Sequence, residues 1–196
     1  MRNGPVRLLL GTTHVSDGEL RIFGTEELTL DVLLASACLP HASQAVSIGG
    51  EAYWDGGYAA NPPLLPLVRT TKASDRLIVQ IIPSHSPEVP KTRPEIDKRI
   101  SQMLFSSSLH KDLEALSVMT ELSRAEDDTS HSRLGRKLQD LRLHRISAED
   151  HVEGLSQAAF DNTNRAFLEG LRDHGRTAAN AWLASQNQEL AMVKAE

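Results

Sequence analysis

Residues 51–67, EAYWDGGYAANPPLLPL, place an acid between a strand-like aromatic segment and two glycines. The acid is Asp55, and the Asp-Gly dipeptide that it begins is a common turn, because Asp bonds its own backbone and Gly accepts positive φ. Taken alone, the stretch leaves two interpretations open. Asp55 is either the first residue of a turn or a carboxylate presented for chemistry, and its neighbours must decide between them.

Composition sets the first limits. A chain of 196 residues with 40% hydrophobic and 24% charged residues is long enough for an ordinary domain with a core. The net charge of −5, with Lys and Arg scattered, argues against nucleic acid as the main partner. The single cysteine, Cys38, excludes an intramolecular disulfide and a cysteine metal cluster, and we expect a buried thiol.

No apolar run of 18 residues is present, so the sequence predicts no transmembrane segment. The run VRLLL near the start is too short for the apolar core of a signal peptide, and no small-residue cleavage site follows it. We interpret it as a buried strand. These features predict a cytoplasmic protein, on the condition that the N-terminus is complete.

Short strands dominate the first part of the chain. Residues 5–15 read as a strand that returns through residues 20–23. Residues 45–48 and 52–54 flank two glycines, which predicts a tight hairpin. DRLIVQIIP, residues 75–83, is a continuous apolar run of the kind found in a sheet covered on both faces, and we expect its residues 76–82 to share a sheet with residues 5–15.

Helical patterns lie between and after these strands. In residues 25–40, Thr25 or Thr29 is suited to cap a helix that Pro40 stops. Its shared face is predicted to consist of Leu30, Leu33, Leu34 and Ala37. Residues 61–63 are suited to begin a short helix that extends to Val68. Longer helices are predicted at 94–124 and 161–185, with a strand at 138–146 between them.

The order of these features resembles the C-terminal half of the patatin-like phospholipase domain. In that family an ASxxxP helix end precedes a hairpin, then a DGG or DGA motif, and then Asn-Pro with a short apolar helix. The matching residues here are Ala35, Ser36, Pro40, Gly49, Gly50, Asp55, Gly56, Gly57, Asn61 and Pro62. The resemblance implies an α/β fold, with a partial patatin-like sheet in residues 1–82. Residues 83–196 would form a mainly helical extension that packs on it.

The same resemblance implies a role for the DGG motif, Asp55, Gly56 and Gly57. Patatin-like hydrolases cleave lipid esters with a Ser–Asp dyad, in which this aspartate is the base, without a cofactor or metal. The chemistry is coherent, because a serine hydroxyl is a weak nucleophile until a positioned base takes its proton. The substrate implied is a lipid or another acyl ester.

The chain departs from the family at the nucleophile. It contains no G-x-S-x-G pentad, the elbow that exposes the serine. The nearest string, GLSQA at 154–158, follows no apolar strand and lies after Asp55 instead of before it. The glycine-rich oxyanion loop is missing too. We therefore expect a C-terminal fragment of a patatin-like hydrolase that is inactive alone.

Two hypotheses from different classes remain open. In one, the chain is part of a serine acyl hydrolase and Asp55 is half of the dyad. In the other, it is a non-catalytic remnant or an interaction module. The eight histidines include no H-x-x-x-H pair, so we expect no metal site. Self-association through an exposed sheet edge is also predicted, because RLIVQII and VRLLL are apolar and low in charge.

Overall fold

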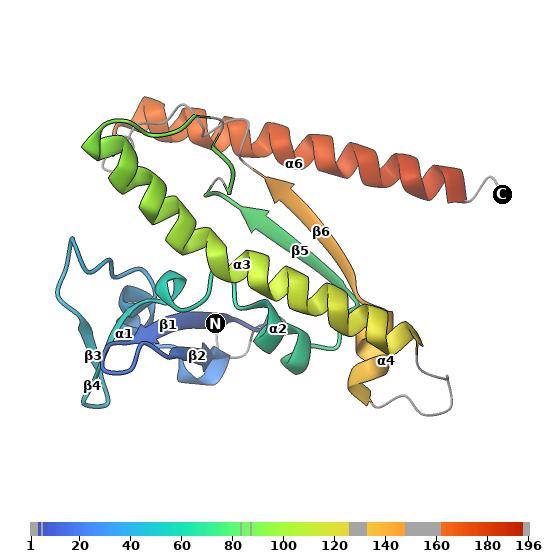
Figure 1. Cartoon of the computed structure of the whole chain (residues 1–196), viewed down its shortest axis with the longest axis horizontal. Coiled ribbons are helices and arrows are strands. Elements are labelled where there is room, and N and C mark those ends of the chain that lie inside the picture. The colour runs from blue at the N-terminus through green and yellow to red at the C-terminus, as the bar shows by residue number, and fades with distance from the viewer. Residues whose placement is uncertain are drawn as a thin grey trace. The chain divides into compact units, whose positions relative to one another are not determined.

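A computed structural model describes residues 4, 6–82, 84–86, 88–125, 133–147 and 162–193 (Figure 1). The chain divides into two compact units. The first contains Met1–Lys72 and Leu104–Asp140, and the second contains Ala73–Met103 and Leu141–Glu196. Small sheets and helices occur together, which confirms the α/β class and is compatible with a partial patatin-like fold.

The first unit contains a four-stranded antiparallel sheet in the order β2-β1-β4-β3. Its strands are β1 (Leu9–His14), β2 (Leu20–Gly24), β3 (Val46–Ile48) and β4 (Glu51–Asp55). The predicted strand pair and hairpin are confirmed, although β1 is shorter than residues 5–15. Ile48 pairs with Glu51 across a two-residue turn, in which Gly49 and Gly50 have φ of 62° and 90°. Two positive φ values are the signature of the type I′ turn, which suits the twist of a hairpin.

The predicted helix at 25–40 is shorter than expected. A 3₁₀ turn, η1 (Thr25–Glu27), is followed by α1 (Leu30–Ala35). Thr29 is the cap, since its Oγ1 accepts from the Val32 N–H at 3.2 Å. Cys38 is buried, as predicted.

The leucines that were expected to share a face of α1 do not form its buried face. Leu30 is 70% exposed, and Leu33 and Leu34 are also exposed, whereas Val32 and Ala35 are buried. The reason is length. A helix of six residues has room for one pair at i and i+3 against the sheet, and here that pair is 32 and 35. The leucines remain on the outside.

The rest of the first unit is helical. It contains η2 (Gly56–Tyr58), α2 (Leu64–Thr70), α4 (Arg133–Gln139) and the part of α3 (Arg93–Ala125) that follows Met103. The Lys137 ammonium donates to the carbonyls of Val68, Arg69 and Thr71, which are left over at the C-terminal end of α2. The buried apolar side chains of this unit are Phe23, Val32, Ala35, Cys38, Leu64, Val68, Leu109, Leu116 and Leu138.

The second unit contains a separate, parallel pair of strands, β5 (Asp75–Gln80) and β6 (Arg142–Ser147), seen side by side in Figure 1. The prediction that residues 76–82 share a sheet with residues 5–15 is therefore wrong. β1 is paired on both sides, with β2 and β4, and the backbone groups of β5 are satisfied instead by β6, a strand of its own unit. The predicted strand at 138–146 begins only at Arg142, because Leu138 belongs to α4.

Burial along β5 alternates, which corrects the expectation of a strand covered on both faces. Arg76, Ile78 and Gln80 are buried, whereas Leu77 is exposed and Val79 is 64% exposed. An alternation of period two is the pattern of a strand with one covered face.

The two long helices confirm the predictions at 94–124 and 161–185 in type and approximate extent. α3 spans Arg93–Ala125, and α6 spans Arg165–Val193. α6 contacts β6, where the Trp182 ring meets the His144 ring edge-on at 5.7 Å. Asp161 and the GLSQA string at 154–158 lie outside the described residues. Among the helices that are described, none is both long and apolar enough to cross a bilayer.

Candidate active site at Asp55

Asp55 is the last residue of β4 and lies next to β1, where it pairs with Thr12. Its backbone N–H donates to the Cys38 carbonyl at 2.9 Å, so the end of the strand is also fixed to the segment after α1. The side chain is half-buried. The predicted place of this carboxylate, at the end of a strand, is therefore what the structure shows.

The two carboxylate oxygens of Asp55 have different surroundings. Oδ1 accepts a hydrogen bond from the Gly57 N–H at 2.7 Å and so caps η2. Oδ2 has no hydrogen-bond partner among the residues that the structure describes. The turn interpretation is thus true of one oxygen, while the second remains able to accept a proton or a hydrogen bond. The turn interpretation of Asp55 therefore does not exclude the chemical one.

Gly56 and Gly57 are required by close packing. A Cβ on Gly56 would overlap the backbone carbonyl of Gly11 in β1, and one on Gly57 would overlap the ring of Phe105 in α3. Neither glycine has a positive φ. The site therefore uses glycine for its small size, which allows β1 and α3 to approach the turn closely.

A stripe of α3 holds the chain that follows the turn. Asn61 donates from its Nδ2 to the Phe105 carbonyl at 3.2 Å and from its backbone N–H to Ser108 Oγ at 2.8 Å. Asp112 Oδ2 accepts from the N–H groups of Leu64 and Leu65 at 3.0 and 3.4 Å. These three α3 residues follow a spacing of three and four, so they share one face of the helix.

This arrangement corrects the predicted start of α2. Asn61 does not cap the helix, and the residue at the cap position, Pro63, has no side-chain hydrogen bond to offer. Asp112 supplies the cap instead, from a position 48 residues along the chain from Leu64. An acid at a helix N-terminus satisfies free N–H groups and interacts favourably with the helix dipole. The available sequence signal was the polar pair Ser108 and Asp112, one helical turn apart in α3, which a search for apolar periodicity alone does not select.

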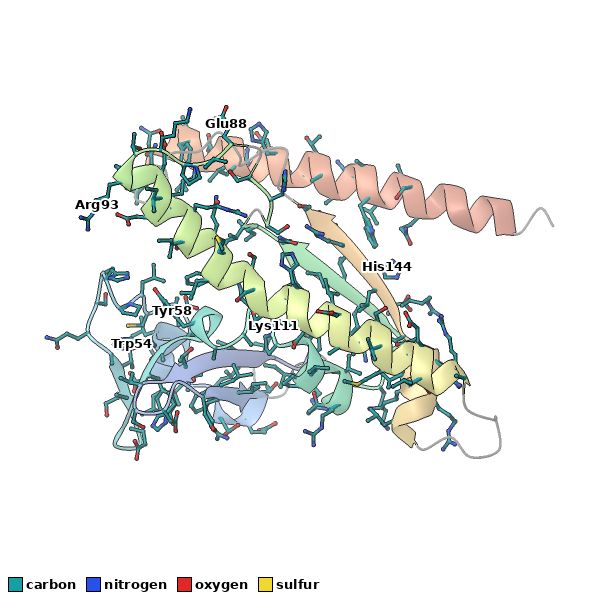
Figure 2. All side chains as sticks on the ribbon, in the orientation of Figure 1. Trp54, Tyr58, Glu88, Arg93, Lys111 and His144 are labelled. Carbon is teal, nitrogen blue, oxygen red and sulfur yellow. The ribbon has the colours of Figure 1, made fainter. Side chains whose placement is uncertain are left out.

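Two aromatic residues, Trp54 and Tyr58, lie close to Asp55 in the sequence, and Figure 2 labels both. Tyr58 meets Phe105 edge-on, with ring centroids 4.9 Å apart. Burial raises the pKa of the Tyr58 hydroxyl, and the negative charge of Asp55 raises that pKa further, so Tyr58 stays neutral at neutral pH. The Trp54 indole N–H is buried and has no hydrogen-bond partner in the described structure.

Among the described residues, no nucleophile is hydrogen-bonded to the Asp55 carboxylate. Within the described ranges, no serine or cysteine side chain hydrogen-bonds to its carboxylate, and Ser36 donates to the Leu33 carbonyl instead. The described chain also shows no group of three His, Cys, Asp or Glu side chains placed to hold a metal ion. The site therefore contains a fixed carboxylate, Asp55, with one oxygen that has no hydrogen-bond partner among the described residues. A neutral phenol, Tyr58, lies near it.

Comparison with known protein families adds one positive match. Residues 11–68 match the patatin-like phospholipase family. No curated protein matches the chain. The patatin-like segment, residues 11–68, runs from β1 to α2 and lies entirely in the first unit. It contains Asp55, Gly56 and Gly57, whereas their supports in α3 lie outside it.

Proposed function

We propose that this chain contributes the aspartate of a Ser–Asp dyad to a patatin-like acyl hydrolase that acts on lipid esters. One observation carries the proposal. Within the patatin-like segment, Asp55 ends a strand with Oδ1 fixed by the Gly57 N–H and Oδ2 without a partner among the described residues. A general base needs this combination of a fixed direction and an available lone pair.

In the proposed reaction, Asp55 accepts the proton of a serine hydroxyl while the serine oxygen attacks the ester carbonyl. The proton passes to the leaving alcohol, and an acyl-enzyme remains. Water then loses a proton to Asp55 and attacks the acyl group, which releases the acid and regenerates the serine. Trp54 and Tyr58, both partly exposed, offer apolar surface to an acyl chain.

The serine and the oxyanion donors come from a segment that this sequence does not contain, since it has no G-x-S-x-G pentad. In this proposal, residues 1–82 are the C-terminal part of the α/β domain and residues 83–196 are its extension. A base without a nucleophile and oxyanion donors retains little catalysis. The chain alone is therefore proposed to be inactive, and its cytoplasmic location and self-association remain predictions.

Ester hydrolysis with and without a complementing segment tests the proposal. Purified chain is assayed on a p-nitrophenyl ester, alone and after mixing with the N-terminal half of a patatin-like relative, which carries the serine elbow. We expect turnover only in the mixture. The expected effect of Asp55→Ala on the mixture is a loss of at least a hundredfold, within the range for general-base removal of about 10²–10⁴.

Asp17→Ala is the matched control. Asp17 also lies in the first unit and also accepts a hydrogen bond from a backbone N–H, that of Glu19, at 2.8 Å, but in the β1–β2 turn. Its replacement should leave turnover in the mixture unchanged. If the mixture kept its turnover after Asp55→Ala, Asp55 would not be the general base. Turnover by the chain alone that depends on Asp55 would show that the nucleophile lies within these 196 residues.

A further inference from the structure

Thr13, in β1, joins the two ends of the turn that carries Asp55. The residue is 5% exposed. The Thr13 hydroxyl donates to the Asp55 carbonyl at 2.7 Å and accepts from the Ala59 N–H at 3.1 Å. Asp55 ends β4 and Ala59 follows η2, so one buried hydroxyl spans residues 55–59.

The Asp55 carboxylate depends on the shape of this turn. Its Oδ1 reaches the N–H of Gly57 only while the backbone of residues 55–57 closes the short ring that the hydrogen bond completes. β1 touches the turn at a second point as well, because Gly56 packs against the backbone of Gly11. The strand therefore holds the turn both by contact and by the Thr13 hydroxyl.

We propose that Thr13 is a positioning residue for the Asp55 carboxylate. By fixing the carbonyl of Asp55 and the amide of Ala59 together, Thr13 sets the backbone that aims the carboxylate. Thr13 lies outside the DGG motif and is here added to the proposed site. Its catalytic meaning rests on the proposed function. The geometry itself can be measured without any hydrolysis.

The hydroxyl group carries this role. A valine at position 13 has almost the same shape and suits a strand, but it leaves the Asp55 carbonyl without the Thr13 donor. The Ala59 N–H is less dependent, since it also donates to the Gly56 carbonyl at 3.0 Å. Loss of the Thr13 hydroxyl should therefore first loosen the Asp55 backbone and weaken the hydrogen bond from the Gly57 N–H to the Asp55 side chain.

The neighbouring residue provides a matched control. Thr12 is fully buried in the same strand, and its hydroxyl donates to the Arg21 carbonyl of β2 at 3.2 Å. Thr12→Val therefore removes a comparable buried hydroxyl on the side away from the turn. Thr13→Ser keeps the hydroxyl at position 13 and removes only a methyl group.

The experiment is amide hydrogen exchange by NMR on the full chain, with the Ser36 amide of the same unit as the internal reference. That amide donates to the Val32 carbonyl, away from the turn. We expect Thr13→Val to speed exchange at Gly57 about tenfold relative to Ser36, the effect of losing a hydrogen bond of typical strength. Thr12→Val and Thr13→Ser should leave the Gly57-to-Ser36 ratio as in the parent chain.

Three results would overturn the inference: an unchanged Gly57 ratio in Thr13→Val, the same change in Thr13→Ser, or the same change in Thr12→Val. If Thr13→Val does not give a folded spectrum, Thr13→Ala removes the hydroxyl without filling its space, and the same criteria apply. Ester hydrolysis does not enter this measurement. A failure of the proposed function thus appears in the complementation assay, and a failure of this inference appears here.

Discussion

Two pairs of glycines flank β4, and they serve different physical needs. Residues 49 and 50 enter the strand with φ of 62° and 90°, and a Cβ on either would meet nothing within 4 Å. Gly56 and Gly57 leave the strand without positive φ, and a Cβ on either would overlap a neighbouring element. The first pair makes a turn by its own conformation. The second pair is required because β1 and α3 approach the turn after β4 closely.

Gly56→Ala should have the largest effect, because the overlapping group is the backbone of a central strand that cannot move alone. We expect a loss of about 3 kcal/mol or more in the free energy of unfolding, beyond the usual cost of overpacking. Urea unfolding followed by circular dichroism measures it. A loss under about 1 kcal/mol would show that β1 yields and that the two glycine pairs are alike.

Gly57→Ala should cost less, about 2 kcal/mol, because the overlapping group is the Phe105 side chain, which can move in part. A double-mutant cycle with Phe105→Leu sharpens the comparison. The smaller side chain should recover part of the loss, so that the two substitutions are not additive. Additive losses would mean that contact with α3 is not the reason for glycine at this position.

Gly50→Ala should cost about 1 kcal/mol, the strain of a left-handed conformation, since the space around Gly50 is open. Gly50→Asn should cost less, because asparagine tolerates this conformation better. Amide exchange at Gly57 should not change in either variant. If Gly50→Ala alters the Asp55 turn, the two ends of β4 are coupled and the comparison fails.

The smallest effect expected is a pH dependence at the hairpin end of the sheet. Hydrogen bonds from the His14 ring to Asp17 and to Glu51 raise the pKa of His14 above its ordinary value of 6.5. A raised pKa means that the stabilisation is complete below pH 6.5 and is lost as the pH rises through the folded-state pKa.

The urea midpoint should therefore fall slightly as the pH rises above about 6.5, and the effect should shrink at high salt because Asp17 and Glu51 are exposed. His14→Gln should reduce the slope. His41→Gln, at an exposed histidine of the same unit, is the control that should keep it. If the urea midpoint of His14→Gln changed with pH as much as that of the parent chain, the contacts of His14 would not be the cause of the pH dependence.

The sequence predicted features whose causes are local. The β3–β4 hairpin follows from two glycines between strand-like segments, the cap of α1 from Thr29, and the place of Asp55 from the composition of the strand before it. Each depends on residues within a few positions. The patatin-like order of these elements could also be recognised, because it is a linear pattern, and the family match over residues 11–68 supports it.

The features that the sequence did not predict depend on distant partners. β5 pairs with β6, a strand far along the chain, and Asp112 caps α2 from 48 residues away. The inner face of α1 depends on which residues meet the sheet, so Val32 is buried although leucines outnumber it. The role of Thr13 is of the same kind, since nothing near it in the sequence points to residues 55–59.

The stripe of α3 that supports the site has an evolutionary consequence. The patatin-like segment ends at residue 68, while Phe105, Ser108 and Asp112 hold the turn and the chain after it. In the function proposed for Asp55, selection would also act on this face of α3, although it lies outside residues 11–68. When homologues are aligned, positions 57 and 105 should change together, because a side chain at position 57 needs a smaller one at position 105.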